Sequence, residues 1–178
     1  MNIFRGWNWA HKFSISNGRI WVAWKPSAYT INILRTSDQF IHCVATQTAT
    51  NKSFRITFTN GRNHESQCQP LWSALQQISL SVPGAWCLVG DFNTILSKDD
   101  RYGGNEVVNH DIQQLSAFMA NCEVLEMPSL GVFFTWTNTT LWSKIDCVFI
   151  NSLWYEVFDY TLAKFLPPGL SDHTPILI

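Results

Sequence analysis

A short apolar stretch followed by a polar turn constrains the fold of this chain more than any other feature. Residues 85–89 read Ala-Trp-Cys-Leu-Val, carry no charge, and are followed at once by Gly90, Asp91, Phe92 and Asn93. An uncharged apolar run of this length predicts a buried strand. Asp91 and Asn93 would then project to the same side of an extended backbone, where Asp91 could accept a proton and Asn93 could donate to an oxyanion. The alternative is a strand that ends in an ordinary Asp- and Asn-containing turn.

The composition fits one domain with a large aromatic core. The chain has 178 residues, 46% of them hydrophobic, and these include nine Trp and twelve Phe. A formal net charge of −1 excludes a global attraction to nucleic acid, so any contact with DNA or RNA must rest on local patches. Five Cys without a Cys-x-x-Cys pair favour reduced thiols and an intracellular protein. The sequence has no apolar run that approaches the ~18 residues of a membrane span.

The first half of the chain alternates between apolar and polar residues as antiparallel strands do. Residues 1–13 show no clear period, whereas strands are predicted at 19–24, 29–34, 40–46 and 54–58. Such spacing favours an antiparallel meander. Apolar residues then recur at helical spacing, which predicts a helix packed against the sheet. They are Leu71, Trp72, Leu75 and Ile78, and Pro70 stands in the predicted first turn.

The second half predicts a charged loop, a second helix and three further strands. In the loop at 97–104, Lys98 and Arg101 are either a contact arm for phosphates or part of a solvated connector. Apolar spacing predicts a helix over 112–122 and strands at 132–136, 144–150 and 158–165. The last three residues are all apolar, so we expect the chain to end within its last strand.

Four short motifs occur in an order that resembles the endonuclease/exonuclease/phosphatase superfamily. They are Gly90-Asp91-Phe92-Asn93, Phe134-Thr135-Trp136, Ser143-Lys144-Ile145-Asp146 and Ser171-Asp172-His173. Three longer stretches look more closely like the endonuclease domain of plant LINE-type retrotransposons. These are Gly-Asp-Phe-Asn-Thr-Ile-Leu at 90–96, Asp-Arg-Tyr-Gly-Gly at 100–104 and Gly-Val-Phe-Phe-Thr-Trp-Thr-Asn at 131–138. The resemblance covers nearly the whole chain.

The resemblance implies an α/β fold in which two packed, mostly antiparallel β-sheets are flanked by helices in a four-layer sandwich. The site would lie at one edge of that sandwich. Enzymes of this family hydrolyse phosphodiesters or phosphomonoesters with Mg²⁺, through attack of water on phosphorus. Such chemistry needs a group that orients or deprotonates the water, and charges that offset those developing on phosphorus and on the leaving oxygen.

By matching motif positions, the resemblance gives roles to individual residues. Asp91 would orient or deprotonate the water, and Asn93 would hydrogen-bond the water or a phosphoryl oxygen. His173 would act on the phosphate or the nucleophile, and Asp146 would fix the tautomer of His173 through its far ring nitrogen. A carboxylate such as Asp146 inside an apolar strand needs a partner in any case.

Two further positions complete the implied site. Asp172 would lie at the edge of the metal, and Trp136 would shape the substrate pocket. Each also has an ordinary structural explanation, because Trp136 could belong to the aromatic core and His173 could be an exposed loop histidine.

The sequence departs from the family pattern near its beginning. We expect an Asn motif on a first strand and then a Glu that is the principal Mg²⁺ ligand, and neither is found before the predicted strands. Asn60 stands where a Tyr is expected, and Lys144 where an Arg is frequent. We therefore expect a single domain over 1–178 that lacks the opening strands and is incomplete at its N-terminus. Asp172 and Asp91 together would be a weaker Mg²⁺ site than one with the missing Glu.

Two functional hypotheses follow. DNA is a possible partner, with at most weak affinity in the second hypothesis, and neither a membrane nor an obligate protein partner is expected. One is an active, Mg²⁺-dependent endonuclease that nicks DNA, for which a nuclear location would follow. The other, which the missing Glu favours, is a degenerate and inactive retroelement remnant with an endonuclease-like fold. A small-molecule phosphatase of the same superfamily is a third possibility. The stretch at 94–104 resembles the retrotransposon endonucleases more than such phosphatases, so it favours the endonuclease.

Overall fold

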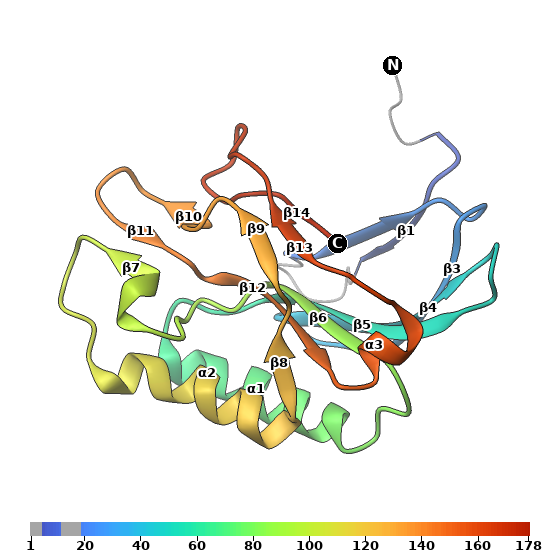
Figure 1. Ribbon diagram of the computed structural model, residues 1–178, viewed down its shortest axis with the longest axis horizontal. Helices are drawn as coiled ribbons and strands as arrows, with labels where there is room; N and C mark the ends of the chain where they lie inside the picture. The colour runs from blue at the N-terminus through green and yellow to red at the C-terminus, as the bar shows by residue number, and fades with distance from the viewer. Residues whose placement is uncertain (1–4, 12–18) are drawn as a thin grey trace.

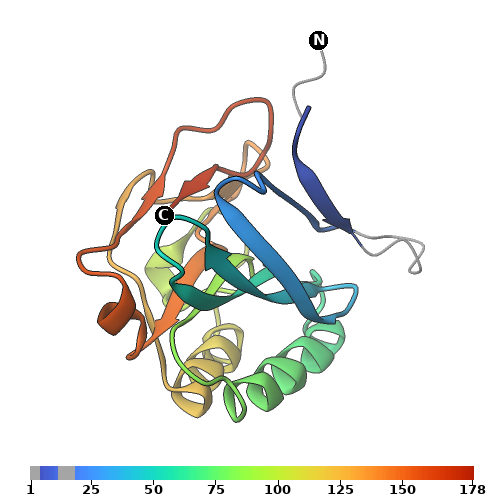
Figure 2. The same ribbon diagram turned by 90° about the vertical axis from the view of Figure 1, so that its right-hand side faces the viewer.

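A six-stranded mixed sheet forms the centre of the molecule in the computed structural model, which describes residues 5–11 and 19–178. Its strands lie in the order β3-β4-β5-β6-β12-β8, and every neighbouring pair is antiparallel except β5 and β6. The bounds are β3 Tyr29–Thr36, β4 Phe40–Gln47, β5 Ser53–Asn60, β6 Trp86–Asp91, β12 Asp146–Asn151 and β8 Val124–Glu126. The helices α1 (Glu65–Ser79) and α2 (Asn109–Cys122) cover one face of this sheet (Figures 1 and 2).

Three small sheets and two short helices make up the rest of the described chain, most of it on the side of the central sheet away from α1 and α2 (Figure 1). The first sheet pairs β1 (Asn8–His11) with β2 (Trp21–Trp24). The second sheet has the order β10 (Trp136–Thr137), β11 (Trp142–Ser143), β7 (Arg101–Tyr102). The third sheet has the order β14 (Ile176–Leu177), β13 (Ala163–Phe165), β9 (Ser129–Gly131). The short helices are the 3-10 turn η1 (Lys98–Asp100) and α3 (Trp154–Val157). The predicted α/β class, with sheets flanked by helices, is confirmed.

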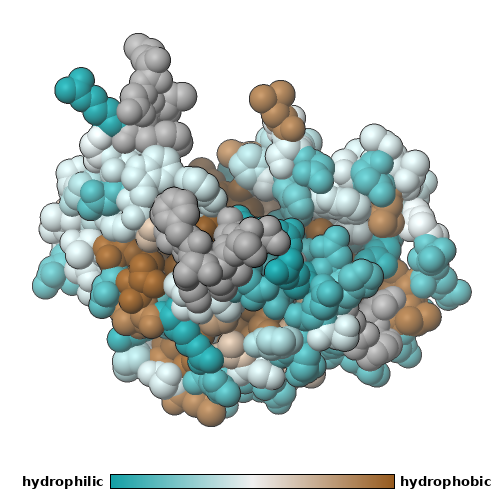
Figure 3. Space-filling model, turned by 180° about the vertical axis from the view of Figure 1, so that it is seen from behind, coloured by the Kyte–Doolittle hydropathy of each residue, from teal (hydrophilic) through white to brown (hydrophobic). Residues whose placement is uncertain are grey.

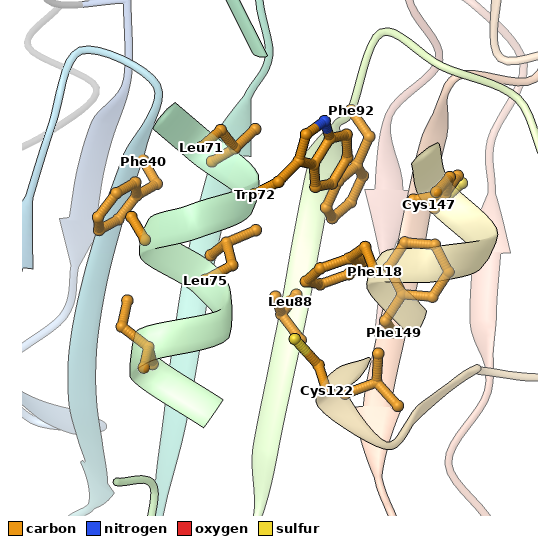
Figure 4. Packing of buried hydrophobic residues seen from close by; sticks show 14 of the residues in the cluster. Phe40, Leu71, Trp72, Leu75, Leu88, Phe92, Phe118, Cys122, Cys147 and Phe149 are labelled. Atoms are coloured by element: carbon orange, nitrogen blue, oxygen red, sulfur yellow. The ribbon is translucent and has the colours of Figure 1, made fainter. Parts of the chain in front are cut away.

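Apolar side chains bury both faces of the central sheet. Between the sheet and the two long helices, the rings of Trp72, Phe92, Phe118 and Phe149 pack against one another, with Phe92 and Phe149 centred 5.0 Å apart (Figure 4). On the opposite face, a second cluster joins residues of β6 and β12 to α3 and β13. Strands that are buried on both faces need apolar residues at nearly every position, which explains the uninterrupted runs in β6 and β12. These two strands therefore hold their terminal carboxylates in a rigid frame.

Hydrophobic side chains also reach the surface in separate patches, which Figure 3 shows between hydrophilic regions on the back of the molecule. Trp21 and Tyr102 are examples of large side chains that are mostly exposed. No helix in the described ranges is both long and apolar enough to cross a membrane.

The predicted helix and strand bounds need three corrections. Helix α1 begins at Glu65, so Pro70 lies inside it instead of in its first turn. Among residues 65–69 only Cys68 is apolar, so this stretch shows no apolar period that would extend the prediction. The strand predicted over 158–165 shrinks to β13, because Tyr160 has φ 55° and interrupts the extended backbone. The strand predicted over 132–136 is also wrong, because Trp136 begins the separate two-residue strand β10 instead of ending a strand that starts at 132.

Candidate active site

The ends of β6 and β12 bring two buried carboxylates together. The register pairs Asp91, the last residue of β6, with Asp146, the first residue of β12, and each is only 6% exposed. Thr135 fixes the start of β12, because its buried hydroxyl accepts hydrogen bonds from the backbone N–H groups of Ile145 (3.1 Å) and Asp146 (3.0 Å). Two acids this close cannot both ionise without cost.

The turn after β6 clamps the carboxylate of Asp91. The backbone N–H of Asn93 donates to Asp91 Oδ1 (2.7 Å), and its side-chain Nδ2 donates to Asp91 Oδ2 (2.7 Å) and to the backbone carbonyl of Gly61 (2.9 Å). Asn93 has φ 51°, so the backbone here is a left-handed turn and not the extended strand that the sequence suggested. Since both amide hydrogens are used, Asn93 orients Asp91 and has no N–H left for an oxyanion.

His173 reaches the same place from the far end of the sequence. A backbone bridge joins His173 to Trp136, and the N–H of Thr174 donates to the carbonyl of Thr135 (2.8 Å). The ring nitrogen Nδ1 lies 2.8 Å from Asp146 Oδ2. Because an ionised carboxylate only accepts hydrogen bonds, Nδ1 carries the proton and donates it, which leaves Nε2 as the reactive nitrogen of the neutral ring.

The surroundings of this cluster raise the pKa values of Asp91 and His173. Burial raises the pKa of the Asp91 carboxyl to about 7, and the charge of Asp146 also raises it. The hydrogen bond from the Asn93 N–H and the charges of His173 and Arg19 lower this pKa, but by less. The hydrogen bond to Asp146 raises the pKa of the His173 imidazole. Asp91 therefore exchanges its proton near neutral pH, where a general base or acid is most effective.

A cavity of about 320 Å³ opens on these groups. Six of the residues predicted from the sequence line it or its rim, and Asp146 lies behind His173: the six are Asp91, Asn93, Arg101, Trp136, Asp172 and His173. Trp136 Nε1 donates to Asp172 Oδ2 (3.0 Å), which lowers the pKa of this exposed carboxyl. The structure does not bring Lys98 into the cavity, because it lies exposed on η1.

Five lining residues were missed as site residues by sequence reasoning: Arg19, Asn63, Leu141, Ser143 and Ile145. Ser143 belongs to one of the four motifs, so its position was available as a signal. Arg19 and Asn63 carry no motif, and only tertiary folding places them here. Lys144 lies in the same motif but forms an ion pair with Glu126 (Nζ–Oε1 2.6 Å) instead of lining the cavity.

The side chains in the described part of the chain do not fit a magnesium site. They include no group of three or more His, Cys, Asp or Glu that could hold a metal ion. The nearest carboxylates are already engaged, since Asp91 accepts from Asn93, Asp146 from His173 and Asp172 from Trp136. Mg²⁺ prefers near-octahedral oxygen coordination by one or two carboxylates plus waters, whereas Asp172, the predicted metal ligand, already accepts a hydrogen bond from Trp136.

Solved structures with low sequence identity share this fold. The endonuclease domain of TRAS1, a telomere-specific non-LTR retrotransposon, is 14% identical, with a TM-score of 0.72 over 97% of this chain and 77% of that chain. TDP2 of D. rerio, in complex with a single-strand DNA product, is 13% identical, with a TM-score of 0.59 over 97% of this chain and 76% of that one. Beta toxin of Staphylococcus aureus with bound magnesium ions is 14% identical, with a TM-score of 0.52 over 83% and 64%.

Sequence comparison gives the family directly. No curated protein matches the chain. Residues 5–173, which include all four motifs, match the profile of the Endonuclease/Exonuclease/phosphatase family. The chain belongs to the Endonuclease/Exonuclease/phosphatase family.

Proposed function

We propose that this chain is an endonuclease-type phosphodiesterase domain that binds a DNA phosphodiester in the cavity and cleaves it at most very slowly. The observation that carries the proposal is the cluster of Asp91, Asp146 and His173, which opens on one cavity beside two arginines. The likeness to the endonuclease domain of a retrotransposon supports DNA, and a retroelement origin, over a small phosphomonoester.

The cavity offers cationic and hydrogen-bonding groups for a phosphate. Arg101 and Ser143 are paired across β7 and β11, and both line the cavity. Arg101 Nε and Ser143 Oγ are buried without a hydrogen-bond partner among the described residues. Buried donors are normally satisfied, so an oxygen-rich ligand would complete them. Arg19 adds a second positive charge at the same cavity.

The residues suit the protein's share of phosphodiester hydrolysis. Asp91, oriented by Asn93 and with a pKa near 7, would accept a proton from the attacking water as the new P–O bond forms. The P–O bond to the leaving sugar oxygen would break, and that oxygen would take a proton from solvent. Protonated His173, held by Asp146, would offset charge on a phosphoryl oxygen together with Arg101. A bound Mg²⁺ would offset charge on the leaving oxygen. The described residues include no group of three or more metal ligands, so we infer that this charge is poorly offset and that cleavage is slow.

An active nicking enzyme is the second candidate, because the TRAS1 endonuclease domain shares the fold over 97% of this chain. A nuclear location would follow from that activity. Supercoiled plasmid with Mg²⁺ separates the two candidates. We expect the same background nicking from the wild type and from His173→Ala, whereas nicking that disappears in His173→Ala would establish the active enzyme and overturn the inactive one.

Binding of a short DNA duplex tests the phosphate site itself. Replacing Arg101 by Gln is expected to weaken binding roughly 3- to 10-fold and to lower the salt dependence by about one counterion, because one phosphate contact is lost. Lys98→Gln is the matched control, since it removes one charge three positions earlier from a side chain outside the cavity. Equal binding by the two variants, measured by fluorescence anisotropy at several salt concentrations, would contradict a phosphate in this cavity.

A further inference from the structure

A second cavity, of about 390 Å³, lies at the other end of β5 from the candidate active site. Arg35 of β3, His42 of β4 and Arg55 of β5 line it, together with residues at the end of α1 and in the loop that follows. Arg55 is near the start of β5 and Asn60 at its end, about 17 Å apart at the usual rise of a strand. Because Asn60 pairs with Asp91, the two cavities are separate.

The two arginines bring positive charge to this cavity. Arg35 donates one hydrogen bond to Gln77 Oε1 (3.1 Å), and Arg55 donates one to the carbonyl of Pro83. Neither forms an ion pair within the described ranges, in contrast to Arg62, which pairs with Asp38. A guanidinium has five N–H donors, so most of those on Arg35 and Arg55 have no hydrogen-bond acceptor among the described residues.

The end of α1 does not require these arginines as caps. The carbonyl of Ile78 accepts from the backbone N–H and the hydroxyl of Ser81, and the carbonyl of Gln76 accepts from Leu80 and Ser79. The last carbonyls of a helix need partners, and these are supplied locally. The positive charge at this cavity is therefore left for another group.

His42 adds a directed donor between the arginines. Its Nδ1 lies 2.8 Å from Thr57 Oγ1, which also accepts from Trp86 Nε1 (2.9 Å). Thr57 is fully buried, and its hydroxyl hydrogen has only His42 Nδ1 as an acceptor among the described residues. Nδ1 thus accepts and Nε2 carries the proton of the neutral ring. Nε2 has no hydrogen-bond partner among the residues that the structure describes, although the side chain of His42 is buried and only 4% exposed.

We propose that this cavity binds a small oxyanion of the phosphate class, held by the guanidinium groups of Arg35 and Arg55 and by the Nε2–H of His42. Planar guanidinium groups match the oxygens of a phosphate and hold it through paired, charge-assisted hydrogen bonds. The phosphate is either free, as inorganic phosphate or on a nucleotide, or part of a DNA backbone. The site is independent of the proposed hydrolytic cavity.

The electrostatics of His42 give this site a local reporter. Burial lowers the pKa of the His42 imidazole to about 4, and the charges of Arg55 and Arg35 act in the same direction. A bound anion offsets both charges, so it raises the pKa of His42. An anion at the hydrolytic cavity would leave the imidazole signals of His42 unchanged.

The test is a titration of the folded protein with inorganic phosphate, followed through the His42 imidazole signals by NMR. We expect a saturable shift and a higher His42 pKa in the wild type, and an affinity at least about tenfold weaker in Arg35→Gln and in Arg55→Gln. Arg35 is exposed, so its variant keeps the test valid if Arg55→Gln fails to fold. Arg101→Gln is the control, because it alters only the hydrolytic cavity and should titrate as the wild type does.

Competition by a single-stranded oligonucleotide distinguishes the sources of the phosphate. Displacement of phosphate by the oligonucleotide supports a DNA backbone, and its failure to compete supports a free phosphate or a nucleotide. A shift that never saturates into the tens of millimolar, or one that is the same in Arg35→Gln, would mean an adventitious ion only and would overturn the site. The duplex binding and plasmid assays are unaffected by that outcome.

Discussion

Gly90→Ala is expected to lower the free energy of unfolding by about 3–5 kcal/mol, the largest loss we predict for a single substitution. Gly90 has φ +132°, and a Cβ there would lie 2.3 Å from the backbone carbonyl oxygen of Thr59 on the neighbouring strand. The parallel pair β5–β6 would have to separate at this point. Asp91, the next residue, would move with it, so the substitution should also disturb the site. Urea denaturation measures the change.

Gly84→Ala is the matched control for this substitution. Gly84 also has a positive φ, +105°, but a Cβ there would meet only Arg55 Nη1, at 3.9 Å. The control therefore adds backbone strain of about 1–2 kcal/mol without a clash. A loss in Gly90→Ala no larger than that in Gly84→Ala would show that β5 and β6 do not approach each other as closely as described.

The second large effect is a dependence of stability on pH that originates at Asp91. The pKa of this acid rises from 3.8 to about 7 on folding, so its contribution to stability is full below pH 3.8 and is lost as the pH rises through 7. A shift of this size corresponds to roughly 4 kcal/mol at most. His173, whose pKa is also raised, acts in the same direction and loses its contribution as the pH rises above 6.5.

Denaturation between pH 4 and pH 8 should therefore show a falling free energy of unfolding for the wild type. In Asp91→Asn most of this change of the free energy of unfolding with pH should disappear. The hydrogen bonds lost in the variant would alter the free energy of unfolding by the same amount at every pH, so they would not affect the slope. Asp99→Asn, which removes an exposed carboxylate from η1, should keep the slope of the wild type. If Asp91→Asn also retained the full slope, burial of an ionisable Asp91 would be ruled out as its source.

The central strands and the site motifs could be predicted because each has a local signal. A strand that is buried on both faces must be apolar at nearly every position, so β6 is visible in the sequence, and a carboxylate in the apolar run of β12 marks Asp146 as unusual. The order of the four motifs then indicated the family, and the structure brings Asp91, Asp146 and His173 together as that resemblance implied.

Other features depend on tertiary contacts that no local pattern encodes. Strands of two or three residues, such as β7 and β10, are too short to show a period of two. The turn at Asn93 depends on the carbonyl of Gly61, so the direction of its amide could not be foreseen. The cluster of Arg35, His42 and Arg55 requires the register of three strands, which includes an irregularity between Ile33 and Arg35.

The measurement that tests the assembled site most directly is the pKa of the His173 imidazole, obtained by NMR in the wild type and in Asp146→Asn. We predict a value above 6.5 in the wild type, because the carboxylate of Asp146 stabilises the protonated ring, and a lower value once that carboxylate is replaced by an amide. The same pKa in both proteins would contradict a site in which Asp146 holds His173 beside Asp91.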